Sequence, residues 1–188
     1  MERTITDVQL PLQTARLTLR PYVESDLDAL FSIRSLAQTV RYLYDEPETR
    51  EQCVTRLAEH PCRTGPGVDV ALSLAMVPNG ESQMIGDMAL WCASAEHRQG
   101  ELGFVLHPDH QGKGYATEAG LALLHVGFEQ VGFHRIVGRL DARNTASSAV
   151  LTRLGMRHEA LLRENEFVKG EWCDEAVYAM LASEWATR

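Results

Sequence analysis

The chain has 188 residues, of which 45% are hydrophobic and 23% are charged, and its formal net charge is −8. This length suits one well-buried domain, so we expect a single domain over residues 1–188. The excess of acidic residues argues against nucleic acid as a partner, and the lack of a long apolar stretch or a signal-like start predicts no membrane segment and a cytoplasmic protein.

The cysteines and histidines show none of the spacings that bind metal ions. Four cysteines, at positions 53, 62, 92 and 173, include no C-x-x-C pair, and the seven histidines include no H-E-x-x-H pair. We therefore expect free, mostly buried thiols and no metal site.

The first third of the chain predicts one strand followed by two helices. Residues 15–21 (ARLTLRP) alternate apolar and polar residues and end at proline, which is typical of an edge strand. The pair Ser25-Asp26 offers N-caps to a helix whose apolar residues recur at helical spacing over 27–34. A second helix is expected after Pro47, followed by a Pro/Gly-rich link over residues 61–67.

The remainder predicts three antiparallel strands, a helix, a strand, a second helix and a final pair of strands. The strand after the first of these helices should run parallel to the strand before it, because a whole helix separates them. The expected elements cover residues 68–77, 83–92 and 101–107 (strands), 117–132 (helix), 134–140 (strand), 141–154 (helix), and 156–167 and 172–181 (strands).

A glycine-rich turn over residues 109–116 (DHQGKGYA) joins a short apolar strand to a long apolar helix. Such a turn leaves backbone N–H groups unpaired, with the positive end of the helix behind them. This predicts an anion cradle that suits phosphate. A Rossmann or P-loop site fits poorly, since neither the position in the chain nor the Gly114 that follows Lys113 matches those motifs.

The turn also resembles a family motif. The segment QGKGYA (111–116) resembles the Q/R-x-x-G-x-G/A signature of the GNAT acetyltransferase superfamily, and ELGFVLHP (101–108) is similar to the family's fourth strand. NTASSAVLTRLGM (144–156) resembles its N-x-x-S segment, with Met156 where phenylalanine is usual. The stretches TARLTLRPYVESDLDAL and EWCDEAVYAMLASEW are further similar to the RimJ/RimL-like branch, the ribosomal-protein N-terminal acetyltransferases.

The resemblance covers nearly the whole chain and implies its architecture. We expect an α/β fold with a mixed sheet, in the order β-α-α-β-β-β-α-β-α-β-β, with a splay between the two central parallel strands. It also implies an N-acetyltransferase that takes acetyl from acetyl-CoA. A homodimer remains an open alternative to a monomer.

The resemblance further implies two contact regions for acetyl-CoA. Backbone amides of the glycine loop are expected to hold the pyrophosphate, because a Cβ on its glycines would keep the backbone away from the phosphates. Main-chain groups of the preceding strand are expected to bind pantetheine, with one N–H stabilising the oxyanion. The expected cofactor-binding residues are Phe104, Val105, Leu106, Gln111, Gly112, Lys113, Gly114, Tyr115, Ala116, Thr117, Asn144 and Ser147.

Glu101 is the first candidate for the general base that deprotonates the amine, directly or through water. An α-amino group needs only a weak base, since about one in ten is already neutral at pH 7. A structural role for Glu101, pairing with a neighbouring strand or capping the turn at Arg98, is an equal alternative. Asp87 and His97 are further candidates.

The proton donor for the departing thiolate is not evident. The resemblance implies a tyrosine in the helix after Asn144, which many relatives carry, but the position that matches by spacing is Leu151 here. Ser147 is our candidate for a hydrogen bond to the sulfur or to pantetheine, and a helix-terminus hydroxyl is the alternative. Water alone is a further alternative, because a thiol is acidic enough to leave readily.

The expected acceptor is the α-amine of a protein or peptide. A small cationic amine such as a polyamine, an aminoglycoside or an amino-acid derivative is the second interpretation, and a non-catalytic acyl-CoA-binding module is the third. Tyr42, Tyr44, Trp91 and Trp172 are candidates to line the acceptor pocket. The two tyrosines have an alternative role in packing a helix connection.

Overall fold

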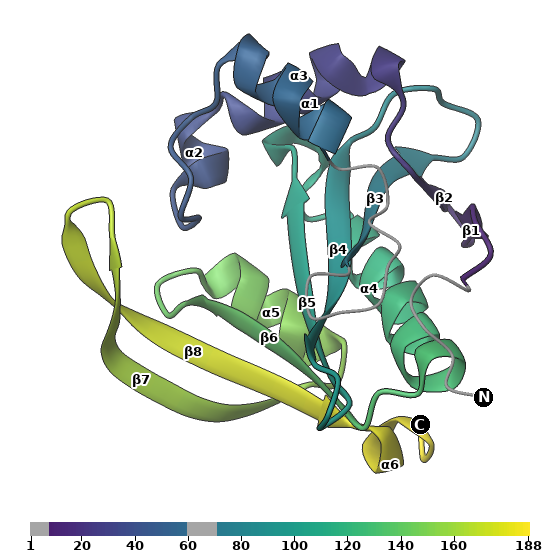
Figure 1. Ribbon diagram of the computed structural model, residues 1–188, viewed down its shortest axis with the longest axis vertical. Coiled ribbons are helices and arrows are strands. Elements are labelled where there is room, and N and C mark those ends of the chain that lie inside the picture. Colours follow the sequence, from purple (N-terminus) through teal and green to yellow (C-terminus); the bar gives the residue numbers. More distant parts are fainter. Residues whose placement is uncertain (1–7, 60–70) are drawn as a thin grey trace.

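The computed structural model describes residues 8–59 and 71–188. The expected link at 61–67, Cys62 and the first residues of the strand expected from 68 lie outside the described ranges. Figure 1 shows one mixed sheet with helices on both of its faces and a long C-terminal hairpin that curves away from it.

Eight strands form the sheet in the order β1-β2-β3-β4-β5-β6-β8-β7. The β5–β6 pair is parallel and the other neighbours are antiparallel. The strands are β1 (Leu12–Gln13), β2 (Leu17–Arg20), β3 (Ala71–Pro78), β4 (Gly86–Ser94), β5 (Gln99–Leu106), β6 (Arg135–Asp141), β7 (Arg157–Val168) and β8 (Glu171–Leu181). The helices are α1 (Leu27–Arg34), α2 (Ala37–Val40), α3 (Arg50–Glu59), α4 (Tyr115–His125), α5 (Thr145–Arg153) and α6 (Ala182–Trp185).

The expected element order is confirmed, including the parallel central pair, and the structure adds β1, α2 and α6. The expectation of an edge strand at 15–21 was wrong, because β1 pairs with β2 on its outer side. The helix after the glycine turn begins at Tyr115 rather than Thr117, and its last turns are π-helical over Val126–Val131.

Asp26 precedes α1 but its side chain does not cap that helix. Its buried carboxylate instead accepts hydrogen bonds from the Val23 amide (2.9 Å) and from Arg20 Nη1 (2.7 Å). The expected cap was wrong because a paired guanidinium holds the carboxylate against the preceding turn.

The sheet separates two apolar layers. On the α1 face, Ala75 and Val77 of β3 pack with Leu30 and Ile33 of α1. On the α4 face, the alternate residues of β3 and β4 pack with α4, and α5 joins them through Leu151. Because side chains alternate along a strand, the two faces of β5 carry different residues. The register places Glu101 on the α1 face and Phe104 on the α4 face.

The sheet opens in the middle, which positions the site. β5 pairs with β6 only from Gln99↔Arg135 to Glu101↔Val137, although both strands continue beyond these residues. In Figure 1, β6, β7 and β8 turn away from β3–β5 past this point. The expected splay between the two parallel strands is therefore present, and it forms a passage from one face of the sheet to the other.

Candidate active site

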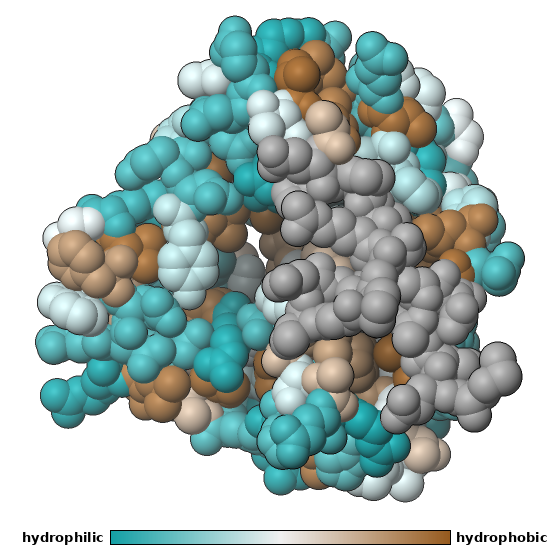
Figure 2. Space-filling view, in the orientation of Figure 1, coloured by the Kyte–Doolittle hydropathy of each residue, from teal (hydrophilic) through white to brown (hydrophobic). Residues whose placement is uncertain are grey.

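A cavity of about 900 Å³ occupies the gap between β5 and β6. Its walls come from α2 and the loop after it, β5, the β5–α4 loop, the end of β6, α5 and the β7–β8 hairpin. Figure 2 shows this side of the molecule hollowed between α2 and α5, with hydrophilic residues along much of the rim. The cavity thus joins the glycine loop on one side to the α1 face on the other.

The β5–α4 loop has the backbone conformation that only glycine adopts readily. Gly112 has φ +74° and Gly114 has φ +83°, and Gly114 is the residue from which α4 begins. A Cβ on Gly112 would meet no protein atom within 4 Å. The loop therefore leaves open space beside its amides at the positive end of α4, which is the geometry of an anion site.

Arg16, in the turn before β2, braces this loop. Its Nη1 donates to the Lys113 carbonyl (2.9 Å), its Nε donates to Glu118 Oε2 (2.6 Å), and its guanidinium lies 4.8 Å from the Tyr115 ring centroid. From the other side, Gln111 Nε2 donates to the Leu106 carbonyl (3.2 Å) and ties the loop to β5. The loop is therefore held in shape by side chains before any ligand binds.

The expected loop residues gather at the cavity, with one exception. The walls include Gln111, Gly112 and the run from Gly114 to Thr117, but not the exposed Lys113. Within the described residues, the buried hydroxyls of Thr39 and Thr117 have no hydrogen-bond partner, and both residues line the cavity. Open glycines and an orphaned hydroxyl beside them fit the phosphate end of an acyl-CoA.

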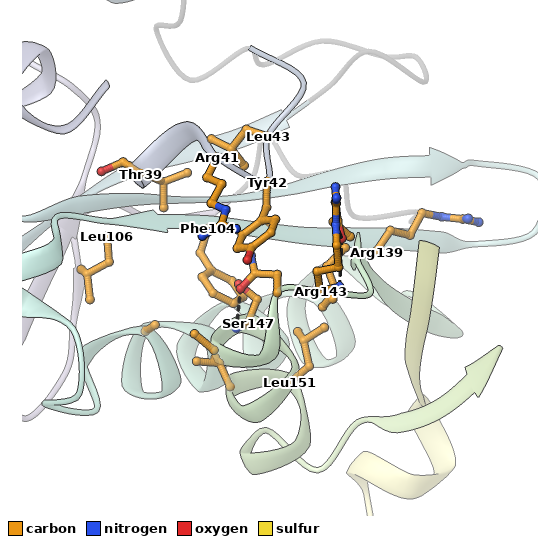
Figure 3. A pocket seen from close by; sticks show the side chains of 18 of the residues that line it. Thr39, Arg41, Tyr42, Leu43, Phe104, Leu106, Arg139, Arg143, Ser147 and Leu151 are labelled. Carbon is orange, nitrogen blue, oxygen red and sulfur yellow. Dashed lines mark hydrogen bonds and ion pairs between the residues drawn. The ribbon is translucent and has the colours of Figure 1, made fainter. Parts of the chain in front are cut away.

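The other expected cofactor residues also meet here. Phe104, Val105 and Leu106 line the cavity from β5, beyond the point where pairing with β6 ends. Asn144 caps α5 by accepting a hydrogen bond from the Ser147 amide (3.1 Å). Ser147 lies in the cavity wall, and Figure 3 shows it on the α5 side, opposite β5.

Glu101 lies on the α1 face of the cavity, where the strands begin to separate. Its side chain is 18% exposed, and Arg139 Nε lies 3.7 Å from Glu101 Oε2. The same arginine donates through Nη1 to the buried Glu175 (3.1 Å). Burial raises the pKa of Glu101 above its ordinary value; Arg139 opposes this rise and Glu175 adds to it. One guanidinium thus serves two carboxylates, which leaves Glu101 a stronger base than an ordinary glutamate.

The alternative bases lie elsewhere. Asp87 is buried outside the cavity walls and is paired with Arg34, whose Nη2 lies 2.8 and 2.9 Å from its two oxygens. His97 is exposed in the β4–β5 turn, also outside the walls. Of the three candidates, the structure brings only Glu101 to the cavity.

Leu151 has a packing role. Its side chain is 2% exposed and lies directly over Gly138 of β6, where a Cβ would come within 2.8 Å of it. Leu151 also lines the cavity but offers no hydroxyl, so a hydroxyl donor must come from another position.

Three of the four aromatic candidates line the cavity, namely Tyr42, Tyr44 and Trp91. Trp172 does not; it is 61% exposed and packs against Phe167, with ring centroids 5.2 Å apart. The sequence reasoning missed Arg16, Arg139 and Glu175, because nothing local to these residues signals their distant partners.

The described part of the chain holds no group of three or more His, Cys, Asp or Glu side chains arranged to bind a metal ion. Cys53, Cys92 and Cys173 are free thiols. Within the described ranges, every helix is too short or too polar to span a bilayer.

Comparisons with known proteins agree with the fold. A family model described as an acetyltransferase (GNAT) domain matches residues 16–157. The N-acetyltransferase YnaD of Bacillus subtilis, whose name marks it as uncharacterized, is 29% identical over 93% of this chain and 98% of its own length. The spermidine N(1)-acetyltransferase of Vibrio cholerae is 24% identical over 93% of this chain and 98% of its own length. A GNAT-family acetyltransferase structure from Bacillus anthracis has a TM-score of 0.83 at 27% identity, over 92% of this chain and 99% of that one. This protein therefore belongs to the GNAT family of N-acetyltransferases, which use acetyl-CoA as the acyl donor.

Proposed function

We propose that this enzyme belongs to the RimJ/RimL-like branch and acetylates the α-amine of a protein or peptide, with the whole chain acting as one domain. The observation that carries the proposal is Glu101, a carboxyl of raised pKa at the opening between β5 and β6. A weak base of this kind suits an α-amine, because the neutral fraction of an α-amine at pH 7 is far larger than that of a lysine.

Different groups along the cavity bind different parts of the substrates. Amides of the glycine loop hold the pyrophosphate, and main-chain groups of β5 from Phe104 to Leu106 hold the pantetheine arm. One β5 N–H stabilises the developing oxyanion, an interaction whose loss typically costs about 3 kcal/mol. Glu101 takes the proton from the amine, and Arg139 stays close enough to adjust the charge of that carboxyl.

A small cationic amine is the second candidate, favoured by the charges around Tyr44. Burial raises the pKa of the Tyr44 hydroxyl, and Glu166, Glu175 and Glu101 raise it further, while Arg139 lowers it. Three carboxylates therefore lie near one arginine at the acceptor end of the cavity, which would attract an amine with more than one positive charge. The similarity to a spermidine acetyltransferase supports the same interpretation.

A panel of amines tests both candidates by measuring free thiol released from acetyl-CoA. The panel contains peptides with a free α-amine, the same peptides with a blocked N-terminus and an internal lysine, spermidine and spermine, and an aminoglycoside. We expect release with free α-amines and none with the blocked peptides. Release with polyamines alone would favour the second candidate. If every amine fails while CoA still raises the thermal stability, the transferase proposal is wrong and the binding-module interpretation replaces it.

A further inference from the structure

Acetyl transfer from a thioester releases a thiolate, and a hydroxyl in the cavity can bind and protonate that sulfur. We propose that Tyr42, from the loop after α2, is this proton donor. The inference rests on the proposed function and adds a residue from the first half of the chain to the reacting centre.

Tyr42 reaches the cavity from the acceptor side. It is half-buried and lines the same walls as Phe104 and Ser147. Figure 3 shows its ring pointing into the pocket, in the view between Phe104 and Arg143, with the hydroxyl end directed toward the α5 side. Within the described residues, no group hydrogen-bonds this hydroxyl, so it is free to donate to a ligand.

A residue distant in the sequence holds the backbone just before Tyr42. The Val40 carbonyl, at the end of α2, accepts hydrogen bonds from the Leu43 amide (2.9 Å) and from Lys169 Nζ (2.7 Å). Lys169 lies at the turn of the β7–β8 hairpin, 129 residues away. These contacts hold both sides of the Tyr42 loop, so the ring is positioned before a ligand arrives.

Two guanidinium groups flank the ring. The Arg41 guanidinium lies 5.1 Å from its centroid and that of Arg143 lies 6.0 Å away. Arg143 directly precedes Asn144, the N-cap of α5, so Tyr42 lies near the positive end of that helix. Arg143 is itself paired with Asp141 (2.6 Å) and Glu171 (2.8 Å), so those carboxylates offset its charge. The Arg41 guanidinium and the start of α5 therefore supply the positive potential that stabilises a thiolate before proton transfer and a phenolate after it.

The other hydroxyls of the cavity are less suited to this role. Tyr44 is 69% exposed and lies near three carboxylates, which disfavour a nearby thiolate. Tyr115 packs under the Arg16 guanidinium at the pyrophosphate end. Ser147 is an aliphatic alcohol and hence a far weaker acid than a phenol. Among these four hydroxyls, Tyr42 is therefore the one that is both a phenol and placed away from the carboxylates near Tyr44 and from the pyrophosphate end.

The proton balance closes without another reactant. The amine nitrogen forms the new N–C bond and loses one proton to Glu101 or water, while the C–S bond breaks and its electron pair stays on sulfur. The Tyr42 hydroxyl gives its proton to that sulfur, which yields the free thiol. Glu101 then releases the amine's proton to water, and the phenolate regains one from water, so both groups return to their starting states.

A binding experiment tests the contact without turnover. Calorimetry at about pH 9, where much of a free thiol is ionised, compares the Kd of CoA with that of desulfo-CoA, which lacks the sulfur. We expect the wild type to prefer CoA by about tenfold, the scale of one hydrogen bond to a charged group. Tyr42→Phe should bind the two ligands within about twofold of each other. An unchanged preference in Tyr42→Phe, or its loss only in Ser147→Ala, would overturn the proposal.

Kinetics provides the second measurement. We expect kcat of Tyr42→Phe to fall about 10- to 100-fold, at the low end for general acids because a thiolate leaves readily, with little change in KM for acetyl-CoA. The alkaline decline of kcat, which reports the donor losing its proton, should disappear. Tyr178→Phe is the matched control, because Tyr178 packs against His158 on the β7–β8 pair, outside the cavity.

The outcomes separate this inference from the function on which it rests. If the wild type transfers acetyl and Tyr42→Phe keeps its rate and its alkaline limb, the Tyr42 assignment is wrong and the transferase stands. If the wild type binds CoA but acetylates no amine, the proposed function fails first. A Tyr42→Phe protein that unfolds at the wild-type temperature excludes a folding defect as the cause of any loss.

Discussion

Replacing Gly112 or Gly114 with alanine separates backbone strain from cofactor binding. Both residues have positive φ, so a Cβ at either position strains the backbone by about 1–2 kcal/mol. For a chain of this size, each kcal/mol shifts Tm by about 2–4 °C, so we expect losses of roughly 2–8 °C. This part of the effect is independent of any ligand.

The ligand-dependent part follows from the space beside the loop. A methyl group on Gly112 meets no protein atom within 4 Å, and one on Gly114 comes within 3.3 Å of Arg16 Nη2 only. Any loss of CoA affinity in Gly112→Ala beyond strain therefore arises from blocked approach of the phosphates. Losing one hydrogen bond to a charged group costs about 1.5–3 kcal/mol, which corresponds to about a 10- to 100-fold rise in Kd.

Gly80→Ala is the matched control. Gly80 has φ +85°, also has no protein atom within 4 Å of a Cβ, and lies in the β3–β4 turn outside the cavity. Calorimetric titration with CoA and thermal unfolding are measured on all three variants. All three should lose similar stability, but only the loop variants should lose affinity. Equal Kd values for Gly112→Ala, Gly80→Ala and the wild type would refute the assignment of this loop to the phosphates.

Two further predictions concern carboxylates. Glu101→Gln should lower kcat by about 10²- to 10⁴-fold, because the general base is lost. In the wild type, kcat should rise with pH as Glu101 loses its proton, and the midpoint of this rise should lie above the ordinary glutamate pKa because burial raises the pKa of Glu101. The rise should be absent in Glu101→Gln. Glu96→Gln, a change at an exposed residue, is the control and should keep the wild-type kcat and its dependence on pH. A Glu101→Gln enzyme with wild-type kcat at every pH would exclude Glu101 as the base. Arg34→Met should lower the free energy of unfolding by about 3–5 kcal/mol in urea titrations, since it leaves the buried Asp87 unpaired. The double variant with Asp87→Leu should recover most of that loss, and equal losses in the two proteins would contradict the ion-pair explanation.

The sequence predicted the parts of the site that depend on local backbone chemistry. Gly112 and Gly114 were recognisable because a turn with positive φ leaves few other choices, and Asn144 because it caps a helix. The position of Glu101 at the cavity followed from its place at the start of a strand that leads into the loop, and its role as the base stays a proposal. Each of these residues depends on neighbours within a few positions of the chain.

The remaining features depend on contacts between distant segments. Arg16 braces a loop 97 residues away, and Arg139 links carboxylates from two other strands. The side-chain cap expected at Asp26 did not form because Arg20 competes for the carboxylate. Such pairings arise only once the sheet brings the segments together, so a local pattern does not signal them.

The separation of β5 from β6 also has a mechanical consequence. The two halves of the sheet share three paired positions. Further contacts between them include Leu154, directly after α5, against Gly120 of α4, and the hydrogen bond from Lys169 Nζ to the Val40 carbonyl. With acetyl-CoA bound as proposed, the substrate lies between the two halves and acts as a temporary cross-link of the sheet. Dissociation of CoA, rather than acetyl transfer, would then remove that cross-link, so we expect the free protein to be less rigid than the complex.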